Sequence, residues 1–164
     1  MKKQFRVVAD SSCLIGLAKV KRFEILRHTF SEIFIPEAVY YEVVVKGKGE
    51  PGSEDTEAAI KEGWILKREV NDKIAVKALS SILGKGESEA IILSKELDAD
   101  YALIDEKIAR EQAELMEVNV IGILGILDLA IEQGISIDKR ELINQLREEG
   151  FRISERLYKR IFPD

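Results

Sequence analysis

Carboxylates stand beside several short apolar segments of the chain, where folding could bring them together. Asp10 follows the run 5–9 and Asp105 follows the run 101–104, and both runs have the residue types of a buried strand. The carboxyl ends of parallel strands share one edge of a sheet, and open α/β folds keep their ligands at that edge. The acids near these segments are Asp10, Glu42, Glu87, Glu89, Asp105 and Glu106.

Such a convergence of carboxylates predicts a cation. Two carboxylates about 5 Å apart repel each other by about 3 kcal/mol at an effective dielectric near 20. Mg²⁺ or Mn²⁺, which prefer oxygen ligands, would neutralise the cluster. One or two such ions lower the pKa of a bound water and stabilise a leaving alkoxide, which is the chemistry of phosphodiester cleavage. Glu87 and Glu106 equally fit a structural role as acids at helix starts.

The other reactive side chains are scarce. The chain has one histidine, His28, near the end of an expected helix, and one cysteine, Cys13, beside Leu14 and Ile15. A single cysteine excludes an internal disulfide and a cysteine zinc cluster. Chemistry must therefore use carboxylates, hydroxyls, lysines or a metal. A phosphatase with Asp10 as nucleophile is an alternative, but the DxD pair common in such enzymes is missing.

Helical and extended segments alternate along the chain, which predicts an α/β fold. The expected architecture is three-layer α/β/α with a central parallel sheet, in a single domain 1–164 with 138–164 as a C-terminal helical extension. The segment 36–45 is ambiguous, because its Val and Tyr content favours a strand whereas Pro36 and the apolar spacing favour a helix. Expected strands are 5–9, 33–35, 64–70, 101–104 and 118–121, and expected helices include 13–20, 23–29, 53–60, 72–83, 87–97, 126–131, 138–149 and 154–162.

Composition limits the partners. The chain has 164 residues with 34% charged residues, and no apolar run reaches the roughly 18 residues of a membrane span. We expect a cytoplasmic protein, since the N-terminus lacks the apolar core of a signal peptide. A net charge of −5 does not favour the binding of nucleic acid, which relies on Lys and Arg to neutralise phosphates. Lys46, Lys48 and Lys85, however, stand next to candidate acids and could steer phosphates.

Five stretches together resemble a known family. They are ADSSCLIGLAKV, IPEAVYYEVV, GKGESEAIILSKEL, DYALIDEKIAR and NVIGILGILDLA, and the tail GFRISERLY adds to them. In this order the chain resembles PIN-domain proteins, the nuclease fold that includes VapC-type toxins, and within it a prokaryotic branch with a longer C-terminal tail. The resemblance implies that 36–45 is helical and that the fold is PIN-like.

The resemblance also implies roles for individual acids. Asp10 matches the family's first acid, Glu42 the second, Glu89 the helix acid and Asp105 the last strand-end acid. Asp10, Glu89 and Asp105 would hold Mg²⁺ or Mn²⁺, and Glu42 would add a ligand or orient water. Ser11 matches a hydroxyl that often follows the first acid. Two positions depart from the toxin pattern: Glu89 stands where Asp is usual, and Ile104 replaces a hydroxyl before Asp105, so that Glu106 could share the role of Asp105.

The function implied is metal-dependent hydrolysis of RNA by an endoribonuclease. Short single-stranded or loop RNA is the expected substrate, a toxin-like role would add an antitoxin protein as partner, and we expect a homodimer. A PIN-like interaction module with weak or absent catalysis is the non-enzyme alternative. A dinucleotide-binding protein is another, because 47–52 is a literal GxGxxG after a strand-like run, although Pro51 removes one amide from its phosphate cradle.

Overall fold

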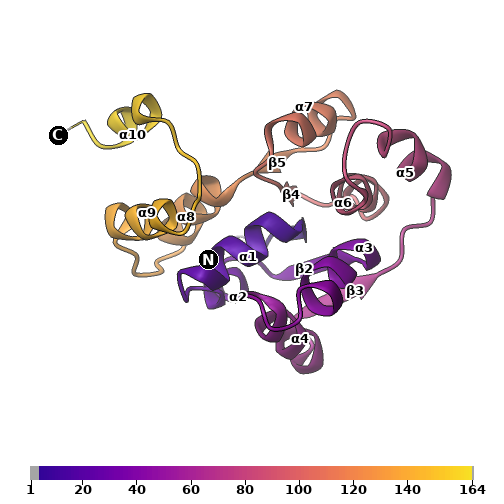
Figure 1. The fold of residues 1–164 in the computed structure, drawn as a ribbon, viewed down its shortest axis with the longest axis horizontal. Helices are drawn as coiled ribbons and strands as arrows, with labels where there is room; N and C mark the ends of the chain where they lie inside the picture. The colour runs from indigo at the N-terminus through magenta and orange to yellow at the C-terminus, as the bar shows by residue number, and fades with distance from the viewer. Residues whose placement is uncertain (1–3, 164) are drawn as a thin grey trace.

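A computed structural model describes residues 4–163, and its centre is a five-stranded sheet in which every neighbouring pair is parallel (Figure 1). The strand order is β3-β2-β1-β4-β5. In the central strand, Val8 pairs with Phe34 on one side and Ala102 on the other. The strands are β1 (Arg6–Ala9), β2 (Glu32–Pro36), β3 (Ile65–Arg68), β4 (Tyr101–Leu103) and β5 (Val120–Ile121).

The strand order creates a crevice beside β1. From β1 the chain first builds β2 and β3 on one side, then returns to place β4 and β5 on the other. Crossovers therefore leave β1 and β4 in opposite directions, and the gap outside their carboxyl ends is where open α/β sheets bind ligands. Asp10 directly follows β1, and Asp105 lies two residues after β4. The topology thus carries both acids to this gap.

Helices cover both faces of the sheet, as Figure 1 shows. Side chains alternate along a strand, so Val7 and Ala9 of β1 pack towards α1, α2, α8 and α9 whereas Val8 packs towards α5 and α6. Three layers result, which confirms the α/β/α prediction. The helices are α1 (Ser11–Lys19), α2 (Glu24–Thr29), α3 (Glu37–Tyr40), the π-helix η1 (Tyr41–Lys46), α4 (Ser53–Glu62), α5 (Lys73–Leu79), α6 (Lys85–Glu96), α7 (Lys107–Leu115), α8 (Ile123–Glu132), α9 (Lys139–Glu148) and α10 (Glu155–Ile161).

The segment 36–45 is helical, as the family resemblance implied. Pro36 precedes α3, and Val39 and Val43 are buried one turn apart against the core. That burial outweighs the strand preference of β-branched residues. The result corrects the dinucleotide alternative: the GxGxxG stretch 47–52 follows the π-helix η1 and not a strand, so the strand–loop–helix context of that motif is absent.

Several boundaries differ from the expectations. The strand expected at 64–70 is only Ile65–Arg68, and the helix expected at 72–83 is Lys73–Leu79. The apolar helix near the end begins at Ile123, so Gly125 lies inside it. A glycine is favoured at this position because Ile121 leaves little room for a side chain. A Cβ on Gly125 would lie 3.0 Å from the Ile121 Cβ.

The C-terminal helices differ in how they are held. On α9, Leu142, Ile143 and Leu146 are buried in the same core as α1, whereas no residue of α10 is buried. Tyr158 of α10 donates a hydrogen bond to Asn144 and lies under the Arg147 guanidinium. Across residues 4–163, no helix combines the length and apolar character needed to cross a membrane.

Burial predicts that replacing either of two isoleucines on neighbouring helices by alanine changes the free energy of unfolding by very different amounts. Ile91 of α6 is fully buried, whereas Ile74 of α5 is 85% exposed. We expect Ile91→Ala to lower the free energy of unfolding by about 3 kcal/mol, because it leaves a cavity, and Ile74→Ala by under about 0.5 kcal/mol. Urea denaturation followed by circular dichroism measures both. Equal losses would mean that α6 does not pack on the sheet as described.

Candidate active site

Asp10 is a buried acid with an unsatisfied oxygen. It occupies the position before α1 and is 2% exposed, yet its side chain caps no amide of the helix. Its Oδ1 has no hydrogen-bond partner among the described residues. The pKa of Asp10 is raised to about 7, mainly by burial and further by the charges of Glu87, Glu42 and Asp105, against a lowering contribution from the Ser11 amide. A lone structural cap would not need this environment.

Glu42 reaches Asp10 from η1, with help from two neighbours. The Ser11 hydroxyl donates a hydrogen bond to Glu42 Oε2 at 2.8 Å. Gly86 of α6 lies against both acids, since a Cβ there would be 3.0 Å from Glu42 Oε1 and 3.6 Å from Asp10 Oδ1. π-Helical turns are rare and often occur at functional sites. Here the turn carries Glu42, glycine leaves room for it, and the Ser11 hydroxyl holds it; the predicted part of Ser11 in metal or phosphate binding stays a prediction.

Asp105 is held at the start of α8. Both carboxylate oxygens accept from the Ile123 amide, at 3.2 and 3.1 Å, and the Cys13 thiol donates to Oδ2 at 3.6 Å. Burial raises the pKa of Asp105, while the Ile123 amide, the Cys13 thiol and the Arg110 guanidinium lower it. Gly122 is required for this arrangement, because a Cβ on it would lie 2.2 Å from Asp105 Oδ1.

Glu87 and Glu106 both act as helix-start acids, and Glu87 also belongs to the cluster. Glu87 Oε1 accepts from the Gly84 amide at 3.1 Å, and Glu106 Oε2 accepts from the Ala109 amide at 2.8 Å. Burial raises the pKa of Glu87, with smaller contributions from Glu106 and Glu42. Glu87 is therefore the helix acid whose charge acts most on Asp10, while Glu106 is exposed at the rim.

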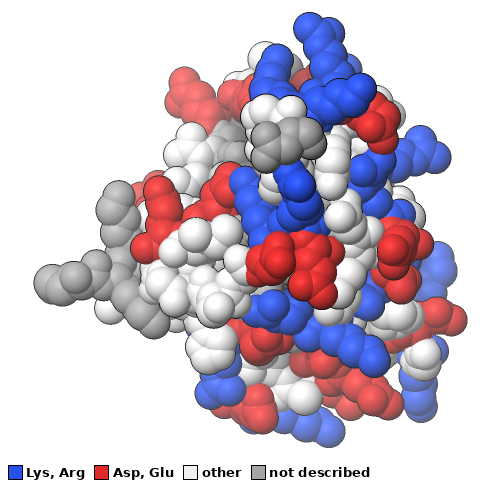
Figure 2. Space-filling view, turned by 90° about the vertical axis from the view of Figure 1, so that its left-hand side faces the viewer, with Lys and Arg blue, Asp and Glu red and all other residues white. Residues whose placement is uncertain are grey.

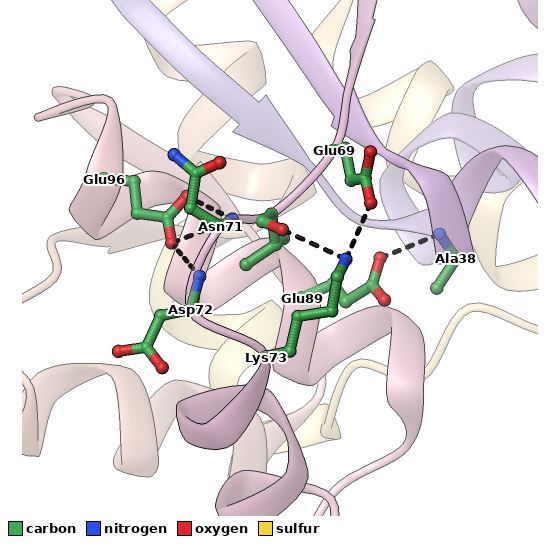
Figure 3. A network of polar contacts seen from close by, with 8 residues as sticks. Ala38, Glu69, Asn71, Asp72, Lys73, Glu89 and Glu96 are labelled. Atoms are coloured by element: carbon green, nitrogen blue, oxygen red, sulfur yellow. Dashed lines mark hydrogen bonds and ion pairs between the residues drawn. The ribbon is translucent and has the colours of Figure 1, made fainter.

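Glu89 is hydrogen-bonded to the start of α3 and does not act on Asp10. It is 8% exposed, and its Oε1 accepts from the Ala38 amide at 2.9 Å (Figure 3). Glu89 is not among the charges that shift the pKa of Asp10. It does line a hollow of about 530 Å³ together with Glu42, Lys46, Lys85 and Gly86. The structure thus gathers Asp10, Glu42, Glu87 and Asp105, and leaves Glu89 at the start of α3.

The acidic cluster has the residue types of a divalent cation site, but its side chains are too far apart to bind an ion in this structure. In the part of the chain from residue 4 to 163, no three His, Cys, Asp or Glu side chains lie close enough together to hold a metal ion as they stand. The unpartnered Asp10 Oδ1, the mutual repulsion of the acids and the space left by Gly86 are nevertheless the features that a hard cation would require. The residues therefore fit the expected Mg²⁺ or Mn²⁺.

The predicted basic residues separate into two groups. Lys46 and Lys85 line the hollow that contains Glu42, whereas Lys48 lies in the exposed turn beyond η1. Arg110 of α7, beside Asp105, is a cation that the sequence interpretation missed, although its place five residues after Asp105 was a usable signal. Figure 2 shows a different face, on the side of the C-terminal helices, where Lys and Arg are interspersed with Asp and Glu.

A comparison with models of protein families identifies the family of this chain. The model of the family DUF3368, described as a PIN domain, matches residues 6–164. The chain belongs to the PIN-domain family. PIN domains are generally nucleases and typically use divalent metals, so this PIN domain belongs to a family associated with nuclease activity.

One solved structure supports the same fold. A PilT N-terminus domain protein, SSO1118, from the hyperthermophilic archaeon Sulfolobus solfataricus P2 is similar with a TM-score of 0.58. The match is 24% identical and covers 77% of this PIN domain and 94% of that chain. At this identity the similarity establishes the fold alone. A search of curated proteins found no match.

The raised pKa of Asp10 predicts an unusual pH dependence of the metal-free protein. The folded state keeps a proton up to about pH 7, whereas the unfolded chain releases it near 3.8. Stability is therefore lost as pH rises through this window, by up to about 4 kcal/mol. Asp10→Asn removes the titration, so in EDTA the variant should exceed the wild type in unfolding free energy at pH 8 and approach it at pH 4.

Urea denaturation at both pH values measures this difference. Glu114→Gln on the exposed side of α7 is the control, because it removes a charge without touching the cluster. A stability difference between Asp10→Asn and wild type that does not change with pH would contradict the buried, protonated state of Asp10.

Proposed function

We propose that this PIN domain is a metal-dependent endoribonuclease that hydrolyses RNA phosphodiester bonds. The observation that carries the proposal is the buried Asp10 with an unpartnered oxygen, surrounded by Glu42, Glu87 and Asp105 at the gap between β1 and β4. Membership of a nuclease family supports the reaction class. The chemistry of the cluster supports a divalent metal.

In this proposal Asp10 and Asp105 hold Mg²⁺ or Mn²⁺, with Glu42 and Glu87 as further ligands. The ion would lower the pKa of a water and stabilise the leaving oxygen. The Ile123 amide and the Cys13 thiol fix the orientation of Asp105. Ser11 fixes Glu42 in the same way.

Three cations near the acids would bind the substrate. Lys46 and Lys85 in the neighbouring hollow and Arg110 beside Asp105 are placed to bind phosphate groups of the RNA. Glu89, the predicted helix ligand, is better placed to support α3 than to reach the ion. The antitoxin partner, the homodimer and the cytoplasmic location stay predictions.

A matched pair of variants tests which helix acid serves the metal. Glu87→Gln should lower the Mn²⁺-dependent cleavage rate of a labelled single-stranded RNA by about a hundredfold, and Asp10→Asn should abolish it, because each removes a proposed ligand. Glu89→Gln keeps an oxygen for the Ala38 amide and should change the rate much less. The reverse ranking of Glu87 and Glu89 would restore Glu89 as the ligand. Full activity of Asp10→Asn would remove Asp10 from the mechanism, whereas no cleavage by wild type with either metal would favour the interaction-module alternative.

Lys46 and Lys48, which lie inside and outside the hollow, together test phosphate steering. Lys46→Glu places a negative charge in the hollow beside Glu42, whereas Lys48→Glu makes the same charge change outside it. At low salt we expect the first variant to raise the Kd for single-stranded RNA about fivefold or more, and the second to have under half that effect. Fluorescence anisotropy at two salt concentrations measures both. Identical effects would mean that only net charge matters.

A further inference from the structure

A second hollow lies beside the candidate active site, between α5 and α6. Its volume is about 370 Å³, within the range of small-molecule pockets. Two buried valines, Val70 and Val76, give it an apolar wall. The remaining lining residues are polar or charged: Lys73, Lys77, Ser80, Lys85 and Glu89.

The wall formed by the start of α5 is well anchored, as Figure 3 shows. The Glu96 carboxylate accepts from the amides of Asn71 and Asp72, with a shortest distance of 2.8 Å. Lys73 donates to Glu69 Oε1 at 2.9 Å and to the Val70 carbonyl at 3.2 Å. Because these contacts hold the loop before α5, the hollow is formed before any ligand arrives, which reduces the entropy lost on binding.

The cations around the hollow are only partly used. Lys73 is paired with Glu69, whereas Lys77 and Lys85 form no ion pair within residues 4–163. The one acid in the lining, Glu89, is engaged by the Ala38 amide. An apolar wall with two unpaired ammonium groups at its edge complements a nucleotide, which has a flat base with little charge and an anionic phosphate.

The two hollows adjoin, since Lys85 and Glu89 line both of them. A strand that passes the catalytic acids would therefore meet Lys46 and Lys85 first and the valine wall next. We infer that the hollow between α5 and α6 binds one unpaired nucleotide of the substrate strand, with the base against Val70 and Val76 and the phosphate at Lys77 and Lys85. The inference rests on the proposed nuclease function and adds to it the place where an unpaired base of the strand is held, because a paired base cannot enter the hollow.

Charge-matched variants test this subsite in the full chain. Lys77→Glu alters the edge of the hollow, and Lys95→Glu makes the same change at the far end of α6. In EDTA at low salt we expect Lys77→Glu to weaken binding of a labelled single-stranded RNA about fivefold to tenfold and to lower the salt slope by about one. Lys95→Glu should weaken it less than about twofold, and a duplex of the same sequence should not distinguish the variants.

Methyl NMR locates the base directly. With single-stranded RNA the methyl signals of Val70 and Val76 should shift, and with inorganic phosphate they should not. Equal binding by the Lys77 and Lys95 variants, unmoved valine signals, or the same shifts with phosphate alone would each overturn the inference.

A separate cleavage assay keeps the two proposals distinguishable. Wild-type cleavage with Mn²⁺ together with equal binding by the lysine variants would remove the subsite and leave the nuclease standing. Valine shifts without any metal-dependent cleavage would remove the nuclease and leave a single-strand binding site.

Discussion

The burial of Asp10 among other carboxylates is the constraint on which the rest of the site depends. Burial raises its pKa to about 7, and Glu87, Glu42 and Asp105 all act in the same direction. A folded protein keeps such a cluster only where protons or a cation neutralise it. The hydrogen bonds from Ser11, Ile123 and Cys13 go to the other acids, and Asp10 Oδ1 is left without a partner. One oxygen of the buried cluster is thus without a hydrogen-bond partner among the described residues.

Much of this arrangement could be predicted from the sequence, because it follows from topology. Asp10 and Asp105 each end an apolar run, and a sheet in which β1 lies between β2 and β4 must bring those ends together. The family resemblance added the helical state of 36–45, which local preferences left open. There the pattern of buried Val39 and Val43 decided the structure, and the strand preference of valine did not.

The sequence could not predict that Glu87 acts on Asp10 while Glu89 accepts a hydrogen bond from α3. Glu87 and Glu89 are two positions apart, so they point about 200° away from each other around the helix. The rotation of α6 is set by contacts from distant parts of the chain: Gly86 against Glu42 and Asp10, and Glu89 against the Ala38 amide. The support of Asp105 by Cys13 was equally hidden, since a lone cysteine beside apolar residues gave no sign of a polar partner 92 positions away.

That cysteine has a practical consequence. Cys13 is fully buried, donates to a carboxylate of the candidate site and is the sole thiol of the chain. A thiol-specific reagent can reach it only when α1 transiently separates from the segment around Asp105. The rate of alkylation therefore reports local opening of the crevice beside β1, and an ion held by Asp10 and Asp105, as proposed above, should slow it.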